Sequence, residues 1–337
     1  MTFTPLVEHT RGPLAEIIHA GAIAVVNAQG QLLAQAGDAQ AVCFTRSTLK
    51  PFQALPFLLA DGPAHFGYAP AHIAMLCASH NGEDMHVQAV DEMLAKSGHS
   101  YRALQCGCHV PLRLSYFGMT PPPELTYDER HNNCSGKHAG FLAYCSQHGL
   151  PLADHLAPSH PLQMAIAQRV AQATGCDESQ WVAGTDGCSA PNYAMPLHNL
   201  AWAFARLASG AADAQFGAAF APLSDAMRQH PELISGTGRN DLAFTQAGRG
   251  DWITKIGADG VQVIASVGRR EAIAIKVASG HMPALYTAAA VSLDQLGWLD
   301  DAQREELKPW GPRPVLSVRG EVVGQVRAAF DLHSRGS

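Results

Sequence analysis

The stretch Trp252–Val267, which reads WITKIGADGVQVIASV, does most to decide the fold. Two runs rich in β-branched residues flank Ala258-Asp259-Gly260, and an Asp-Gly pair between such runs is a strong β-hairpin signal. A third run with strand character, Glu271–Ala278, follows soon after. The late part of the chain therefore predicts three antiparallel strands.

The N-terminal part shows the same pattern. Ala15–Val26 is apolar and β-branched, and Gln31–Ala36 follows it after a glycine-containing turn. Between these two β-rich ends, helical periodicity dominates. The helix candidates are Pro51–Ala60, Glu83–Ser97, Lys137–His148, Pro161–Thr174, Met195–Ala208, Phe216–Arg228 and Met282–Leu296.

One antiparallel sheet built from both chain ends is the economical interpretation of this order. We predict an α/β (α+β) fold with an α/β domain of residues 1–45 and 251–337, whose sheet is covered by helices. Residues 46–250 would form a mainly helical domain, with the active site where the two domains meet.

Composition and charge restrict the function classes. The 337 residues are 47% hydrophobic and 15% charged, with a formal net charge of −6 and no block of like charges. A nucleic-acid or anionic-membrane partner is therefore not expected, and no apolar run approaches the ~18 residues of a membrane helix. The chain start has no export pattern, and the eight cysteines fit reduced thiols, so we expect a cytoplasmic protein.

Three short clusters carry the chemical signal: Ser47-Thr48-Leu49-Lys50, Ser79-His80-Asn81 and Lys255-Ile256-Gly257. In order they spell S-x-x-K, S-x-N and K-x-G, the motif set of serine hydrolases that use a lysine base. A serine hydroxyl becomes a good nucleophile only when a base removes its proton, and a neutral amine can do so.

These motifs predict two serine–lysine pairs. Lys50 would lie one helical turn from Ser47 and activate it, while Ser79 and Lys255 would relay protons. The structural alternatives are a helix cap at each serine, a surface lysine at position 50 and a strand-end lysine at position 255.

Five blocks of the chain together resemble the asparaginase II family, the class 3, rhizobial-type L-asparaginases. The blocks are Arg46–Pro51 (RSTLKP), Ser79–Glu83 (SHNGE), Asn133–His138 (NCSGKH), Thr185–Pro191 (TDGCSAP) and Lys255–Gly260 (KIGADG). The resemblance runs from about Glu16 to Phe330. It implies a fold like the serine β-lactamases and glutaminases, hydrolysis of L-asparagine to L-aspartate and ammonia, and a homodimer.

The resemblance also implies site residues. Catalysis would depend on Ser47, Lys50, Ser79 and Lys255. A zinc site of two cysteines and a lysine would be formed by Cys134, Lys137 and Cys188.

Read physically, two cysteines alone are a weak indication of zinc, and a lysine ligand must first lose its proton. Residue rules alone would choose His138 or His131 instead, and structural buried thiols are the alternative. Cys106-Gly107-Cys108-His109 is a competing cluster. A zinc ion beside the serines would orient the substrate rather than generate hydroxide.

Three further polar residues are candidates for substrate hydrogen bonds: Asn81, His138 and Asp186. Asp186 could bind a substrate ammonium group. Each of the three could equally be a polar side chain that stabilises its own turn.

The sequence thus predicts an L-asparaginase that acts through a serine acyl-enzyme. The nearest alternative is a glutaminase, or another Ser-Lys amidohydrolase such as a β-lactamase or D-aminopeptidase. A second alternative is a zinc-dependent amidohydrolase with a metal-activated water. A third is a catalytically inactive binding or sensory protein of the same fold.

Overall fold

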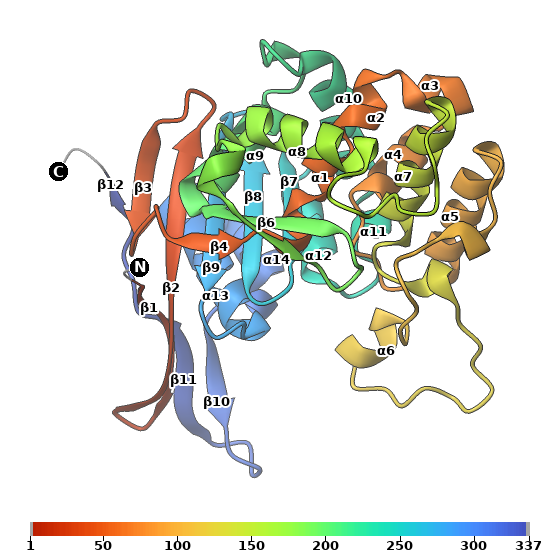
Figure 1. The fold of residues 1–337 in the computed structure, drawn as a ribbon. Coiled ribbons are helices and arrows are strands. Elements are labelled where there is room, and N and C mark those ends of the chain that lie inside the picture. Colours follow the sequence, from red (N-terminus) through yellow and green to blue (C-terminus); the bar gives the residue numbers. More distant parts are fainter. Residues whose placement is uncertain (1–2, 335–337) are drawn as a thin grey trace. The chain divides into compact units, whose positions relative to one another are not determined.

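The computed structural model describes residues 3–334, which divide into two compact units (Figure 1). Unit 1 comprises the described residues up to Thr48, Met195–Ala208 and the described residues from Ala243 onward. Unit 2 comprises Leu49–Ala194 and Ser209–Leu242. Unit 1 therefore joins the two ends of the chain, and unit 2 contains most of its middle.

Unit 1 contains most of the strands. Its elements are β1 (Thr4–Arg11), β2 (Leu14–Asn27), β3 (Leu32–Ala36), β4 (Val42–Phe44), α9 (Leu197–Ala208), β7 (Trp252–Gly257), β8 (Val261–Ser266), β9 (Glu271–Val277), α13 (Met282–Gln295), α14 (Asp301–Leu307), β10 (Arg313–Leu316), β11 (Val322–Ala328) and β12 (His333–Ser334). Three elements contain the boundaries of the units: the 3₁₀ helix η1 (Arg46–Leu49), β6 (Pro191–Pro196) and α12 (Asn240–Ala247).

Unit 2 is mainly helical. Its elements are α1 (Lys50–Gln53), α2 (Leu55–Leu59), α3 (Gly62–Phe66), α4 (Pro70–Leu76), α5 (Asp84–Lys96), α6 (Leu112–Tyr116), α7 (Ser135–Gln147), α8 (Pro161–Thr174), β5 (Val182–Thr185), α10 (Gly217–Gln229) and α11 (Pro231–Ile234).

The sheet of unit 1 is antiparallel, with strand order β10-β11-β1-β2-β9-β8-β7; β3 also pairs with β2, and β12 pairs with β3. The predicted hairpin joins β7 to β8, where Gly257 pairs with Val261. Its turn residues Asp259 and Gly260 have φ of 57° and 77°, the left-handed conformation that an Asp-Gly turn supplies. The antiparallel sheet built from both chain ends is therefore confirmed.

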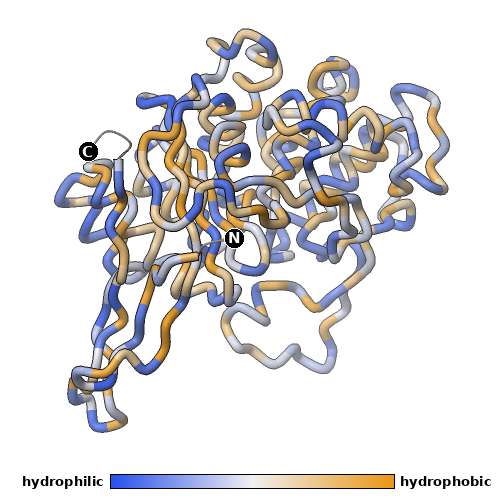
Figure 2. The backbone as a smooth tube through the Cα atoms, turned by 60° about the vertical axis from the view of Figure 1, so that its left-hand side comes forward, coloured by the Kyte–Doolittle hydropathy of each residue, from blue (hydrophilic) through white to orange (hydrophobic). Residues whose placement is uncertain are grey.

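Helices cover both faces of this sheet. Side chains of α13 share one hydrophobic core with Ile23 and Val25 of β2 and with Ile273 and Ile275 of β9. Helix α9 contacts β2, β8 and β9 but contributes nothing to that core, so it packs on the opposite face. Figure 2 shows hydrophobic and hydrophilic residues interspersed along the backbone.

Two expectations need correction. Helix α9 lies within residues 46–250, which we assigned to the helical domain, but it belongs to unit 1 because its apolar face packs on the sheet. The expected helix Pro51–Ala60 is two short helices, α1 and α2. Pro56 has no N–H for the carbonyl four residues back, which explains the break. Within residues 3–334, no helix has the length and hydropathy that a membrane crossing requires.

Candidate active site

Lys50 is the first residue of α1, and only 1% of its surface is exposed. Its Nζ donates hydrogen bonds to Ser79 Oγ at 2.9 Å, to the Asn133 carbonyl at 3.1 Å and to the Ala78 carbonyl. These three acceptors match the three protons of an ammonium group. Within unit 2, the lysine of the first motif thus contacts the serine of the second.

Ser79 lies just beyond the C-terminal end of α4 in a fixed backbone position. Its N–H donates to the Ile234 carbonyl at 2.7 Å. The next residue, His80, is fully buried, and burial holds its pKa well below the usual value. The neutral ring accepts from Gly82 N–H at 3.1 Å and contacts Ser135 Oγ at 2.9 Å. His80 therefore fixes the serine loop against the start of α7.

A glycine allows α7 to approach α4 closely. A Cβ on Gly136 would lie 2.3 Å from the Met75 carbonyl oxygen, a distance that no alanine could adopt without displacing one helix. This approach places the N-terminus of α7 beside the Ser79 loop. The Asn133–His138 block is thereby held near Lys50, whose ammonium group contacts the Asn133 carbonyl.

The two predicted cysteine ligands and the lysine between them meet in unit 2. Cys134 is the N-cap of α7, Lys137 lies in its first turn, and Cys188 lies in the turn between β5 and β6. Lys137 Nζ donates to Cys188 Sγ at 3.1 Å, and all three side chains are buried.

The hydrogen bond between the two thiols, burial and the Lys137 charge determine which thiol ionises. A hydrogen bond from Cys134 lowers the pKa of Cys188, while the same contact and burial raise that of Cys134. Burial alone would lower the pKa of Lys137, but the charge on the sulfurs raises it. These contacts favour ionisation of Cys188 over that of Cys134, with the Lys137 charge beside the Cys188 sulfur.

His138 completes the surroundings of this cluster. The side chain is fully buried, and burial lowers its pKa to about 4, so the ring is neutral near pH 7. The ring contacts the Cys188 sulfur, which counteracts part of the effect of burial on its pKa. A neutral imidazole beside two sulfurs is a donor set that suits zinc, and Lys137 could join it after losing a proton.

The competing cluster Cys106–His109 lies against Asn132 and Asn133, which directly precede Cys134. Asn132 Nδ2 donates to the Cys106 carbonyl at 2.9 Å, and His109 Nε2 lies 3.1 Å from Asn133 Oδ1. Burial, reinforced by the charge on Cys188, raises the pKa of the Cys106 thiol to about 12. Cys106 therefore stays protonated and is less suited to bind a metal than Cys188.

Ser47 and Lys255 belong to unit 1, where Ser47 lies in η1 and Lys255 in β7. A Cβ on Gly257 would meet the Thr45 carbonyl at 3.0 Å and Ser47 N at 3.4 Å. The glycine of the K-x-G motif thus lets the end of β7 approach the serine segment. Because residues two apart share one face of a strand, the Lys255 side chain starts from that same face. Its Nζ is fully buried and donates to the Ile256 carbonyl at 2.8 Å.

Arg46, directly before Ser47, has a left-handed backbone with φ of 50°. Its guanidinium group binds the carboxylate of Asp259 in the β7–β8 turn. A non-glycine residue in this conformation costs about 1–3 kcal/mol and persists where its surroundings hold it. The ion pair is such a restraint, and it joins the Ser47 segment to the K-x-G hairpin.

The three candidate substrate-binding residues have different surroundings. All polar atoms of Asn81 are bound: Oδ1 accepts from Arg239 at 3.0 Å, and Nδ2 donates to Glu83 and to the Thr237 carbonyl. His138 faces Cys188 inside unit 2. Asp186 is half-buried in the Cys188 turn, close enough to raise the pKa of Lys137.

Arg239 was missed from the sequence. Only 3% of it is exposed, and its guanidinium carbon lies 3.7 Å from the centre of the Tyr116 ring. Within residues 3–334, its Nε has no hydrogen-bond partner and no carboxylate pairs with the group. The available signal was a basic residue after Gly236-Thr237-Gly238, since a glycine-rich turn can bring a charge into a buried site.

The family model described as L-asparaginase II matches residues 7–328, nearly the whole chain. The chain belongs to the asparaginase II family. Among solved structures it is similar to one described as a β-lactamase from Mycobacterium bovis, with 15% identity, 82% of this chain and 94% of that chain covered, and a TM-score of 0.42. No curated protein matches the sequence.

In this asparaginase II family member, unit 2 contains Lys50, Ser79, the cysteine cluster and the three substrate candidates, and unit 1 contains Ser47 and Lys255. The pairing of Ser47 with Lys50 and of Ser79 with Lys255 stays a prediction. Within unit 2, Lys50 and Ser79 form a pair that can transfer a proton. A buried amine 2.9 Å from a serine hydroxyl can exchange a proton with it.

Proposed function

We propose that the protein is an L-asparaginase that hydrolyses L-asparagine to L-aspartate and ammonia through a serine acyl-enzyme. The observation that carries this proposal is the buried contact of 2.9 Å between Lys50 Nζ and Ser79 Oγ in a member of the asparaginase II family. Ser47, Lys50, Ser79 and Lys255 would act in one reaction.

The proposed reaction needs a neutral lysine amine. Lys50 in that form accepts the proton of the serine hydroxyl, either directly or through the other serine, and the serine oxygen attacks the side-chain amide carbon. The tetrahedral intermediate collapses when the leaving nitrogen receives that proton and departs as ammonia. Water then attacks the ester and gives a proton to the amine; the amine returns that proton to the departing serine oxygen as aspartate is released.

Arg239 would hold the α-carboxylate of asparagine. A buried guanidinium group without a carboxylate partner is costly, and a bound carboxylate would remove that cost. Asn81 orients the guanidinium group from the serine loop. Replacing Arg239 by methionine should raise KM far more than it lowers kcat, whereas an Arg102→Met change at a distant exposed position would alter neither. An unchanged KM in a folded Arg239→Met variant would exclude this role.

Cys134, Lys137 and Cys188 would bind one zinc ion, with His138 beside it. The metal would supply Lewis acidity and a fixed positive charge that orients the substrate. Asp186, in the same turn as Cys188, would bind the substrate ammonium group. The residues fit this role because two buried sulfurs and a neutral imidazole meet there beside Lys137.

A zinc-dependent amidohydrolase with a metal-activated water is the second candidate, favoured by the same cluster. Chelation should abolish activity in that enzyme and only weaken it in an acyl-transferring one. A homodimer and a cytoplasmic location are further proposals from the sequence. Light scattering on the purified chain and fractionation of cells test these two.

Ammonia release from asparagine and from glutamine tests the proposed substrate. We expect turnover of asparagine to exceed that of glutamine, and loss of nearly all turnover in Ser47→Ala. Ser209→Ala, in unit 2 but outside the motifs, is the control. Preference for glutamine would favour the glutaminase alternative, and no turnover of any amide would favour a binding protein.

A further inference from the structure

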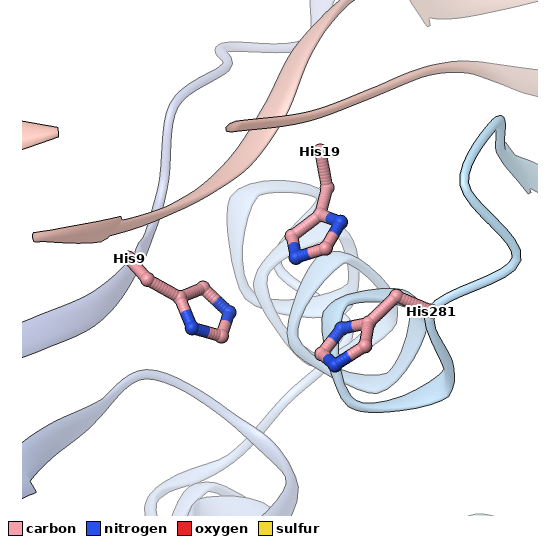
Figure 3. A group of neighbouring side chains, drawn as sticks. All are labelled: His9, His19 and His281. Atoms are coloured by element: carbon pink, nitrogen blue, oxygen red, sulfur yellow. The ribbon is translucent and has the colours of Figure 1, made fainter. Parts of the chain in front are cut away.

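Three histidines from distant parts of the chain meet in unit 1: His9 on β1, His19 on β2 and His281 at the N-cap of α13 (Figure 3). One nitrogen atom of each ring lies within 4.8 Å of those of the others. None of the three was a candidate from the motifs.

Sheet register explains the meeting. Val7 pairs with His19, and His9 pairs with Ile17, so both histidines lie on one face of the sheet as diagonal neighbours. That face also carries Ile23, whose side chain packs in the core with α13. The N-cap residue of α13 therefore completes the group.

Two of the rings present a nitrogen atom without a partner. Nε2 of His9 and Nε2 of His19 are buried and have no hydrogen-bond partner among residues 3–334. Ser279 Oγ accepts from the backbone N–H of His281 at 3.4 Å. It also lies 2.9 Å from the ring atom Nδ1 of His19 and is placed to accept from that nitrogen too. In the tautomer that donates from Nδ1, a lone pair stays on His19 Nε2, the arrangement found in metal-binding histidines.

The surroundings of all three rings favour their neutral form. Burial lowers the pKa of each, and the positive charge of Arg313 lowers those of His9 and His281 further. Neutral imidazole is the form that binds metal, and it suits zinc, copper and nickel. The charge of Arg313 also opposes a cation and should weaken its binding.

We propose that His9, His19 and His281 bind one zinc ion, which joins β1 and β2 to the start of α13. This site is independent of the proposed asparaginase activity and of the cysteine cluster. Zinc–nitrogen bonds of about 2.0–2.1 Å would bring the three nitrogens to about 3.3 Å from one another.

His281 must rotate on binding. Its ring is stacked on that of His19 at 4° and 4.4 Å between centroids, and parallel rings cannot direct their lone pairs at one ion. Its Nδ1 accepts from the Ala284 N–H at 3.2 Å. His9 and His19, whose rings meet at 62°, would bind first, and His281 would exchange this helix cap for a bond to zinc.

Zinc titration by calorimetry and by thermal unfolding tests the proposal, with a Cys134→Ser/Cys188→Ser variant as the parent protein so that the cysteine cluster does not compete. We expect one zinc per chain and a Tm that rises with zinc concentration. His19→Gln should abolish both effects, while His65→Gln, at an exposed position in unit 2, should leave them unchanged.

His281→Asn separates the two roles of His281. Asparagine is a good N-cap, so the Tm without zinc should stay the same, while zinc affinity falls by about tenfold or more. Zinc content of the otherwise unaltered chain gives a second measurement, since His19→Gln should lower it by one ion. Equal zinc binding by His19→Gln and its parent, or no binding at micromolar zinc, would overturn the proposal.

Discussion

Replacing Lys50 by methionine should abolish catalysis while leaving the fold largely intact. Methionine keeps most of the buried stem but removes the donor to Ser79, Ala78 and Asn133. The Ala78 and Asn133 carbonyls lose this donor, and an acceptor that is buried without a donor costs about 1–3 kcal/mol. In the unaltered chain, burial of the Lys50 ammonium group without a carboxylate partner among the described residues costs several kcal/mol. The variant avoids this cost.

These opposing contributions nearly cancel, so we expect the free energy of unfolding to change by no more than about 2 kcal/mol, which is a Tm shift of a few degrees. Loss of a positioned base lowers the rate by about 10²–10⁴. The assay is ammonia release at saturating asparagine together with thermal unfolding, and Lys96→Met, an exposed lysine on α5, is the matched control. A folded Lys50→Met variant with kcat within about tenfold of the unaltered enzyme would refute the reasoning.

Three other predictions concern pH and metal. Because a lysine base must be neutral, kcat/KM should rise from neutral to alkaline pH, and a maximum at acidic pH would exclude such a base. The Cys188→Ser variant should lose zinc, because a hydroxyl is a far poorer ligand than a thiolate. It should also raise KM more than it lowers kcat, and unchanged zinc content would refute the cysteine site. Burial alone would raise the pKa of Glu83, but hydrogen bonds from Asn81 and Thr237 outweigh it and lower the pKa below 4.5. The carboxylate thus stabilises the fold above pH 4.5, and this stabilisation is lost as the pH falls through the lowered pKa. In urea unfolding, the difference in stability between the unaltered chain and Glu83→Gln should therefore shrink as the pH falls below 4.5. A difference that stays constant with pH would contradict this prediction.

Local signals predicted the periodic elements well. Helix α8 begins and ends where Pro161 and Thr174 were expected, and the Asp-Gly turn gave the β7–β8 hairpin. Strand β1 was missed because its alternation of buried and exposed residues is irregular, and register shifts interrupt the pairing of β1 with β2 and of β10 with β11.

The site residues were found through short motifs, but their contacts were not. The hydrogen bond from Lys50 to Ser79 depends on how α1 packs beside the end of α4. Arg239 carries no local signal of burial, since its surroundings come from Tyr116 and Asn81, more than 100 residues earlier in the chain. The histidine group likewise depends on sheet register and on the packing of α13.

Intact-protein mass spectrometry after brief mixing with asparagine tests the acyl-enzyme most directly. The account predicts a transient adduct with the mass of an aspartyl ester, which peptide mapping places on Ser47, and no adduct in Ser47→Ala. An adduct on Ser79 alone would move the nucleophile to the serine that contacts Lys50. Steady turnover of asparagine with no adduct on either serine, and complete loss of that turnover on chelation, would contradict the central claim and favour a metal-activated water.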